Sequence, residues 1–139
     1  MMMRAETEEV VVRPLGKTET ETLLGCDFSA ITFMYGGKEG CFAIISRFNH
    51  KVIGYLLCPE EEITLFITKP ERDKGFGSTA FSLCLDLLFG TLGRKKITAV
   101  CLVEETTSVK TLEHCGFERV SEAEGKIHWE MTAANWELL

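Results

Sequence analysis

The stretch that decides the fold is Arg72-Asp73-Lys74-Gly75-Phe76-Gly77, and Ser78 follows it directly. Before it, the apolar run at residues 63–67 is typical of a buried strand, and residues 78–89 after it carry the pattern of a helix. A glycine loop between a strand and a helix can close around phosphate groups, because glycine adopts backbone conformations that other residues avoid. The free N–H groups of the helix start then point at the anion. This segment therefore predicts a pyrophosphate site.

Two cations and an apolar helix face accompany this loop. Arg72 and Lys74 would add charge-assisted hydrogen bonds to phosphate oxygens. The predicted apolar face of the helix consists of Phe76, Ala80, Leu83, Cys84, Leu87 and Leu88. These positions follow the period of an α-helix, and Gly90 and Gly93 mark its end. A loop that serves only as a turn and a helix cap is the alternative interpretation.

Length and composition are those of an ordinary single globular domain. The 139 residues carry a net charge of −6, which argues against general nucleic-acid binding. No apolar run approaches the roughly 20 residues of a membrane span, and the start lacks a secretory signal. The six cysteines include no C-x-x-C pair. We therefore expect a reduced, cytoplasmic protein without a metal site, a nucleic-acid partner or a membrane partner.

The first half of the chain predicts an antiparallel arrangement. Its expected elements are a strand at residues 10–13, a helix at 17–24, an ambiguous segment at 26–35, and β-rich runs at 41–46, 52–58 and 62–67. Thr18 or Thr20 would cap the helix. Turn residues at 47–51 and 59–61 join the three β-rich runs, so we expect a three-stranded meander.

The second half alternates between helices and strands. Its expected elements are a strand at residues 96–103, a helix that starts at Thr106 or Thr107 and stops at Gly116, and a hairpin of residues 117–120 and 126–132. The strand is a continuous β-branched run, which is typical of a strand covered on both faces. Residues 94–96 form a basic turn that we expect to be solvated, with a phosphate contact as the alternative. Together, the expected elements of the two halves predict a mixed α/β fold with a β-loop-helix-β crossover in the middle.

The loop Arg72-x-x-Gly75-x-Gly77 resembles the signature Gln/Arg-x-x-Gly-x-Gly/Ala of the GNAT family of N-acetyltransferases. A second landmark of that family is an Asn-x-x-Ser/Ala helix that ends in Gly-Phe. It corresponds to residues 105–108 and 116–117 here. The resemblance covers roughly residues 41–132, and residues 62–80 look most like the branch typified by ribosomal-protein N-terminal acetyltransferases. It implies a GNAT-like mixed sheet with splayed central strands.

The resemblance also implies a cofactor and the residues that bind it. The acyl donor would be acetyl-CoA, the acceptor a primary amine on a small molecule or a peptide, and family members often pair as homodimers. The implied cofactor-binding residues are Leu65, Phe66, Ile67, Arg72, Asp73, Lys74, Gly75, Phe76, Gly77, Ser78, Glu105 and Ser108. The pantetheine arm would pair with residues 65–67, where that strand splays from residues 99–101. A backbone N–H near Phe66 would face the thioester oxygen.

Two positions depart from the family pattern. Glu105 stands where many members carry Asn, and an ionised carboxylate cannot donate to pantetheine or phosphate oxygens. Either that contact is lost or Ser108 supplies it. Leu112 stands where many members carry a Tyr thought to protonate the leaving thiolate. Ser108 or a water is then the remaining candidate for the general acid.

Glu62 is the residue that we expect to act as the general base. By resemblance it aligns with a strand-borne glutamate of the ribosomal branch, and a carboxylate can take the proton that an ammonium must lose before attack. The alternative is that residues 60–62 are only an acidic turn. The leading hypothesis is an N-acetyltransferase with direct transfer in a ternary complex. A non-catalytic acyl-CoA sensor and a purely structural module are the alternatives.

Overall fold

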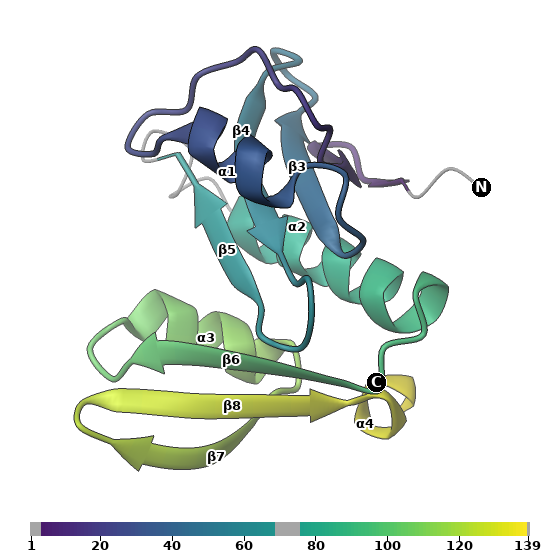
Figure 1. The fold of residues 1–139 in the computed structure, drawn as a ribbon. Coiled ribbons are helices and arrows are strands. Elements are labelled where there is room, and N and C mark those ends of the chain that lie inside the picture. The colour runs from purple at the N-terminus through teal and green to yellow at the C-terminus, as the bar shows by residue number, and fades with distance from the viewer. Residues whose placement is uncertain (1–3, 69–75, 139) are drawn as a thin grey trace.

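The computed structural model describes residues 4–68 and 76–138, which form two antiparallel sheets covered by short helices (Figure 1). The first sheet contains, in spatial order, β1 (Ala5–Glu6), β2 (Val10–Pro14), β3 (Cys41–Ser46), β4 (Val52–Leu57) and β5 (Thr64–Ile67). The second sheet contains, in spatial order, β6 (Lys96–Leu102), β8 (Lys126–Thr132) and β7 (Glu118–Ala123). The helices are α1 (Phe28–Tyr35), α2 (Phe76–Leu85) with its π-helical continuation η2 (Asp86–Thr91), α3 (Thr106–His114) and α4 (Ala133–Glu137).

The predicted meander is confirmed, because β3, β4 and β5 pair antiparallel in sequence order. Side chains point alternately to the two faces of a strand, so this sheet separates two apolar clusters. Phe42 and Leu56 belong to the cluster on the α2 side. Ala43, Tyr55 and Phe28 belong to the cluster on the α1 side. The sheet therefore has a helix on each face, and both faces are buried (Figure 1).

The helix after the glycine loop buries the face that its sequence predicts. Phe76, Ala80 and Cys84 are buried against the first sheet, and α2 packs on β5. The chain continues as η2, and Gly93 follows it with a φ of +67°, a conformation that favours glycine. Of the helices in the described ranges, none has the length and apolarity needed to cross a bilayer.

The two sheets meet at one point and then part. In the described chain, the link between β5 and β6 is an isolated parallel bridge between Glu62 and Thr98. The Ile63 N–H donates to the Thr98 carbonyl, and the Thr98 N–H donates to the Glu61 carbonyl, both at 2.9 Å. From there β5 continues along β4 and β6 continues along β8, so the two neighbouring strands diverge (Figure 1). The expected splay of the central strands is thus present.

The helix expected at residues 17–24 is wrong, and the first helix is α1 in the segment that the sequence left ambiguous. The Glu19 carboxylate accepts hydrogen bonds from the Arg13 guanidinium at 2.7 and 3.0 Å. The Glu21 carboxylate accepts one from the Val52 N–H at 2.9 Å. These contacts to the sheet replace helical hydrogen bonds along a segment rich in threonine, which is a poor helix former. Asp27 caps α1 instead, because its side chain accepts from the Ala30 N–H.

The Arg13–Glu19 pair predicts an acid-sensitive contribution to stability. The hydrogen bonds from Arg13 hold the pKa of Glu19 below its ordinary value. Their stabilisation is therefore present at neutral pH and is lost as the pH falls through that lowered pKa. We expect Glu19→Gln to lower the free energy of unfolding by about 1 kcal/mol at pH 7 and to leave it unchanged in acid. Urea titrations across pH measure this. An equal loss at every pH would contradict it.

The expectation that residues 96–103 form a strand covered on both faces is also wrong. Burial alternates along β6: Ile97, Ala99 and Cys101 are buried, whereas Val100 and Leu102 are 40% and 38% exposed. The predicted hairpin of β7 and β8 is confirmed, and it completes a sheet in which β8 lies between β6 and β7. That sheet buries one face against the core, so the β-branched run has cover on one side only.

Candidate active site

β5 and the residues just before it present side chains alternately to the two faces of the first sheet. Ile63 and Ile67 are buried in the cluster on the α2 side. Phe66 packs against the cluster on the α1 side. Glu62 and Thr64 line a hollow that the last residue of α1 also lines. The point where β5 and β6 separate therefore borders the buried cluster of the α2 side on one face of the sheet and the hollow on the other face.

The start of α2 is the described part of the predicted pyrophosphate site. Arg72, Asp73, Lys74 and Gly75 lie outside the described residues, so their role stays a prediction. Phe76 is buried in the core, which leaves its backbone rather than its side chain available to a ligand. A Cβ added at Gly77 would lie 3.9 Å from Ile67 Cγ1 and 4.0 Å from Leu65 Cδ2, which are ordinary contact distances. Among the described residues there is thus room beside Gly77, and Ser78 is exposed.

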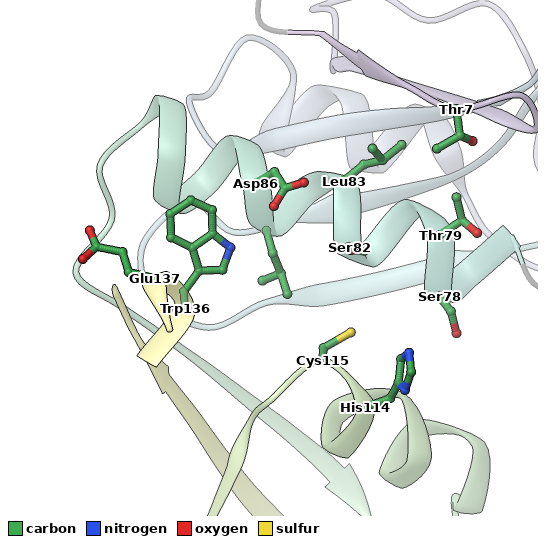
Figure 2. A pocket seen from close by; sticks show the side chains of 11 residues that line it. Thr7, Ser78, Thr79, Ser82, Leu83, Asp86, His114, Cys115, Trp136 and Glu137 are labelled. Carbon is green, nitrogen blue, oxygen red and sulfur yellow. The ribbon is translucent and has the colours of Figure 1, made fainter. Parts of the chain in front are cut away.

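A groove runs along α2 from this point, with a cavity volume of about 790 Å³. We call it the α2 groove. Figure 2 shows the side chains that line it: Thr7, Ser78, Thr79, Ser82, Leu83, Leu85, Asp86, His114, Cys115, Trp136 and Glu137. Hydroxyl groups of α2 form one wall, and the end of α3 forms the opposite one (Figure 2). Ser78 is predicted from the glycine motif, whereas the other lining residues are not, because no local pattern brings α3 and α4 to this helix.

A second hollow of about 460 Å³ lies where β5 and β6 separate. Its lining residues are Tyr35, Leu57, Pro59, Glu60, Glu61, Glu62, Thr64 and Thr98. We call it the acidic hollow, because three of these residues are glutamates and none of the described residues that line it is a lysine or an arginine. All three glutamates are exposed. Their carboxylates give the hollow a negative potential that attracts cations.

An aromatic stack lies beside the acidic hollow and fixes the α1 face of β5. The Tyr55 ring lies between the Phe28 and Phe66 rings, with centroid distances of 6.3 and 5.3 Å and nearly parallel planes. Such offset pairs stabilise beyond the area that they bury. Burial raises the pKa of Tyr55, so its hydroxyl stays protonated at neutral pH. The stack holds the Phe66 ring, whereas the predicted role of the Phe66 N–H stays a prediction.

The structure does not bring the two predicted polar residues of α3 into either hollow. Glu105 is at the N-cap position of α3, where Thr106 or Thr107 was expected, and its carboxylate accepts from the Leu102 N–H at 2.8 Å. That bond turns the carboxylate back toward β6. Ser108 is half-buried on α3, and among the described residues that line the two hollows neither Ser108 nor Glu105 occurs. Their roles in cofactor binding and proton transfer stay predictions.

All six cysteines lie within the described residues as free thiols. Within residues 4–68 and 76–138, no cluster of three or more His, Cys, Asp or Glu side chains could hold a metal ion. Cys101 is buried and its sulfur accepts from the Trp129 indole N–H at 3.2 Å. It is therefore a packing residue of the core.

The sequence matches the family model of the acetyltransferase (GNAT) domain over residues 10–118. This match covers most of the chain, so the chain belongs to the GNAT acetyltransferase family. The family transfers acetyl groups from acetyl-CoA to amine acceptors. Among curated proteins the sequence has no match. The family predicted from the glycine loop and from the helix that ends in Gly-Phe is thus confirmed.

Solved structures of acetyltransferases share the fold. The ribosomal-protein-S5-alanine acetyltransferase from Vibrio fischeri gives a TM-score of 0.76 at 16% identity, over 96% of this chain and 98% of that chain. An acetyltransferase (GNAT family) from Bacillus anthracis gives 0.75 at 14% identity, over 94% and 99%. Mutant forms of the spermidine/spermine N-acetyltransferase from Vibrio cholerae give 0.72 at 16% identity, over 95% and 98%. At these identities the likeness establishes the mixed α/β fold alone.

Proposed function

We propose that the protein is an N-acetyltransferase that moves the acetyl group of acetyl-CoA to a primary amine by direct attack in a ternary complex. One observation carries this proposal. In a chain of the GNAT family, Glu62 lies at the isolated bridge where β5 and β6 part, and it lines the acidic hollow. A carboxylate at the mouth of the splay can meet an amine that approaches from the α1 side.

The residues at the start of α2 fit the cofactor. Among the described residues, a Cβ at Gly77 would meet Ile67 and Leu65 at ordinary contact distances, and the start of this ten-residue helix presents its positive dipole to an anion. Ser78 is exposed at the same end. When bound, acetyl-CoA supplies the thioester that the amine attacks. Gly77 and Ser78 would hold its pyrophosphate, together with the predicted contacts of residues 72–75.

The acidic hollow supports a positively charged acceptor. An amine reaches the protein as an ammonium ion, and Glu60, Glu61 and Glu62 would attract that charge. Glu62 would then take the proton, directly or through water, so that the neutral amine can attack. The named acceptors of two structural neighbours are the alanine of a ribosomal protein and spermidine or spermine. Both carry amines, and we propose an amine acceptor of this general kind.

The direct test is a panel of amines incubated with acetyl-CoA, with release of the coenzyme A thiol as the readout. The panel contains polyamines, amino sugars, amino acids and peptides with free N-termini. We expect at least one amine to accelerate thiol release above the rate of acetyl-CoA hydrolysis, and cationic acceptors to react best. Saturating binding of acetyl-CoA without turnover on any amine would contradict the transferase proposal.

The second candidate function is a non-catalytic acyl-CoA sensor, and two residues favour it. Leu112 is buried at the position where many family members carry a tyrosine. The Glu105 carboxylate already accepts a hydrogen bond from the Leu102 N–H. Coenzyme A at a hundred times its dissociation constant should stabilise either protein by about 2.7 kcal/mol. Only the enzyme should also release thiol with an amine. A purely structural module should show neither effect. The cytoplasmic location and a homodimer remain part of the proposal.

A further inference from the structure

Arg94 reaches back to two turns that are distant in the sequence. It follows η2 and precedes β6, where its own N–H donates to the Leu88 carbonyl at 2.9 Å. Its guanidinium Nη1 donates to the Glu60 carbonyl, and its Nη2 donates to the Glu39 carbonyl at 3.4 Å. A longer contact of 3.9 Å joins Nη1 to the Cys58 sulfur. The expected solvated basic turn is thus wrong for Arg94, which is half-buried and bound to the backbone.

The guanidinium of Arg94 thus contacts the turn that leads directly to Glu62. Arg94 holds the turn at the Glu60 carbonyl. One residue further, the Glu61 carbonyl accepts from the Thr98 N–H at 2.9 Å, and the Ile63 N–H donates to Thr98 at 2.9 Å. The backbone around Glu62 is therefore fixed on one side by a guanidinium and on the other side by β6. Both contacts hold the backbone from which the Glu62 side chain extends.

Gly40 lies directly beside the Arg94 guanidinium, where a side chain would clash with it. A Cβ at Gly40 would meet the Cys58 carbonyl oxygen and would lie 2.5 Å from Arg94 Nη2. Gly40 also has a φ of +87°, which other residues rarely adopt, and its carbonyl accepts from the Cys58 N–H at 2.9 Å. Gly40, Cys58, Glu60 and Arg94 therefore form one packed unit, and Glu60 also lines the acidic hollow.

The Arg94 guanidinium contacts backbone and sulfur atoms. Its partners among the described residues are two carbonyl oxygens, a sulfur and the backbone of η2, and no carboxylate is paired with it there. Among the described residues, Glu60, Glu61 and Glu62 line the hollow and none of their carboxylates is paired with Arg94. A guanidinium suits this task, because its several donors can hold more than one carbonyl in a fixed geometry.

We propose that Arg94 is a positioning residue that holds Glu62 at the splay between β5 and β6. This inference rests on the proposed function, in which Glu62 takes the proton of the acceptor amine. Arg94 itself touches neither the acceptor nor the cofactor. It acts by fixing the turn at residues 59–61, and so the distance between the base and the amine.

The kinetic test compares Arg94→Ala, Arg94→Lys and a matched control, Arg47→Ala. Arg47 also donates to a backbone carbonyl, that of Thr7 at 3.1 Å, but it lies in the β3–β4 hairpin. We expect Arg94→Ala to lower kcat by about tenfold to a hundredfold, because a base that is displaced by about 1 Å transfers protons poorly. The KM for acetyl-CoA should stay within about twofold, since the start of α2 is untouched. Arg94→Lys should keep part of the activity, and Arg47→Ala all of it.

Added guanidinium ion separates a positioning role from a general loss of folding. At low millimolar concentrations it should restore part of the kcat of Arg94→Ala, and sodium chloride at equal ionic strength should not. Rates are measured below the melting temperature of each variant. If Arg94→Ala does not fold, Arg94→Lys replaces it in the comparison with the wild-type protein. An unchanged kcat per folded molecule in both Arg94 variants would overturn the proposal.

Hydrogen exchange tests the same role without turnover. The Ile63 and Thr98 amides form the bridge beside Glu62, so we expect them to exchange about tenfold faster in Arg94→Ala, while the Val10 and Val12 amides in β2 do not change. If the wild-type protein acetylates no amine, faster exchange still supports Arg94 as the residue that positions this turn, and only the transferase proposal fails. Unchanged exchange at both amides would overturn the inference about Arg94.

Discussion

Gly77→Glu should abolish binding of coenzyme A while the chain stays folded. The position lies in the first turn of α2, and among the described residues an added Cβ would meet Ile67 and Leu65 at ordinary contact distances. A carboxylate at a helix N-terminus is also electrostatically favourable, so stability should change little. The same carboxylate would occupy the space of a pyrophosphate and repel it. Like charges in contact cost several kcal/mol, so we expect the dissociation constant to rise about a hundredfold or more.

Isothermal titration with coenzyme A measures this effect, and thermal unfolding without ligand confirms the fold. Gly77→Gln is the matched control, because it adds nearly the same volume without the charge. We expect it to weaken binding less than Gly77→Glu does. A Gly77→Glu variant that binds coenzyme A with wild-type affinity would remove the start of α2 from the cofactor site, and the proposed function would lose its donor.

Glu62→Gln should lower kcat by about a hundredfold to ten-thousandfold, the usual range for loss of a general base. The amide has the shape of the carboxylate but cannot take a proton. The bridge at this position is made by backbone atoms of Ile63, Thr98 and Glu61, so the splay itself should persist. The defect should shrink as the pH approaches the pKa of the acceptor amine, since more of the amine is then already neutral.

Steady-state kinetics across pH test this expectation. Glu61→Gln is the matched control, because Glu61 lines the same hollow but is not the predicted base. We expect Glu61→Gln to raise the KM of a cationic acceptor and to leave kcat near the wild-type value. Both variants should bind acetyl-CoA normally. A Glu62→Gln enzyme with a wild-type rate and pH profile would show that residues 60–62 are only an acidic turn.

Local pattern was enough to predict the elements whose partners are close in sequence. The meander of β3, β4 and β5 follows from β-rich runs joined by short turns. The buried face of α2 follows from helical periodicity, with Phe76, Ala80 and Cys84 in the core. The helix expected at residues 17–24 failed because Arg13 and Val52, on two strands of the sheet, hydrogen-bond to Glu19 and Glu21. The helix propensities of residues 17–24 do not reflect hydrogen bonds to strands that lie outside this segment.

The site residues also fall into two groups: those predicted from local sequence, and those brought together only by tertiary contacts. Gly77 and Ser78 were predicted from a motif within one loop, and Glu62 from its resemblance to a glutamate of the ribosomal branch of the family. That Glu62 lies beside Thr98, and that Arg94 holds the turn before it, depends on contacts across tens of residues. The basic run at residues 94–96 carries no local sign of such a contact, so the sequence predicted solvent there.

The sequence by itself determined the family, the strand and helix periodicity, and the glycine loop, because each is written in neighbouring residues. The tertiary structure decided which faces of the strands are covered, where β5 and β6 separate, and which carboxylates share the acidic hollow. These features arise when distant segments compete for the same core and the same backbone hydrogen bonds. That competition is settled only in the folded chain.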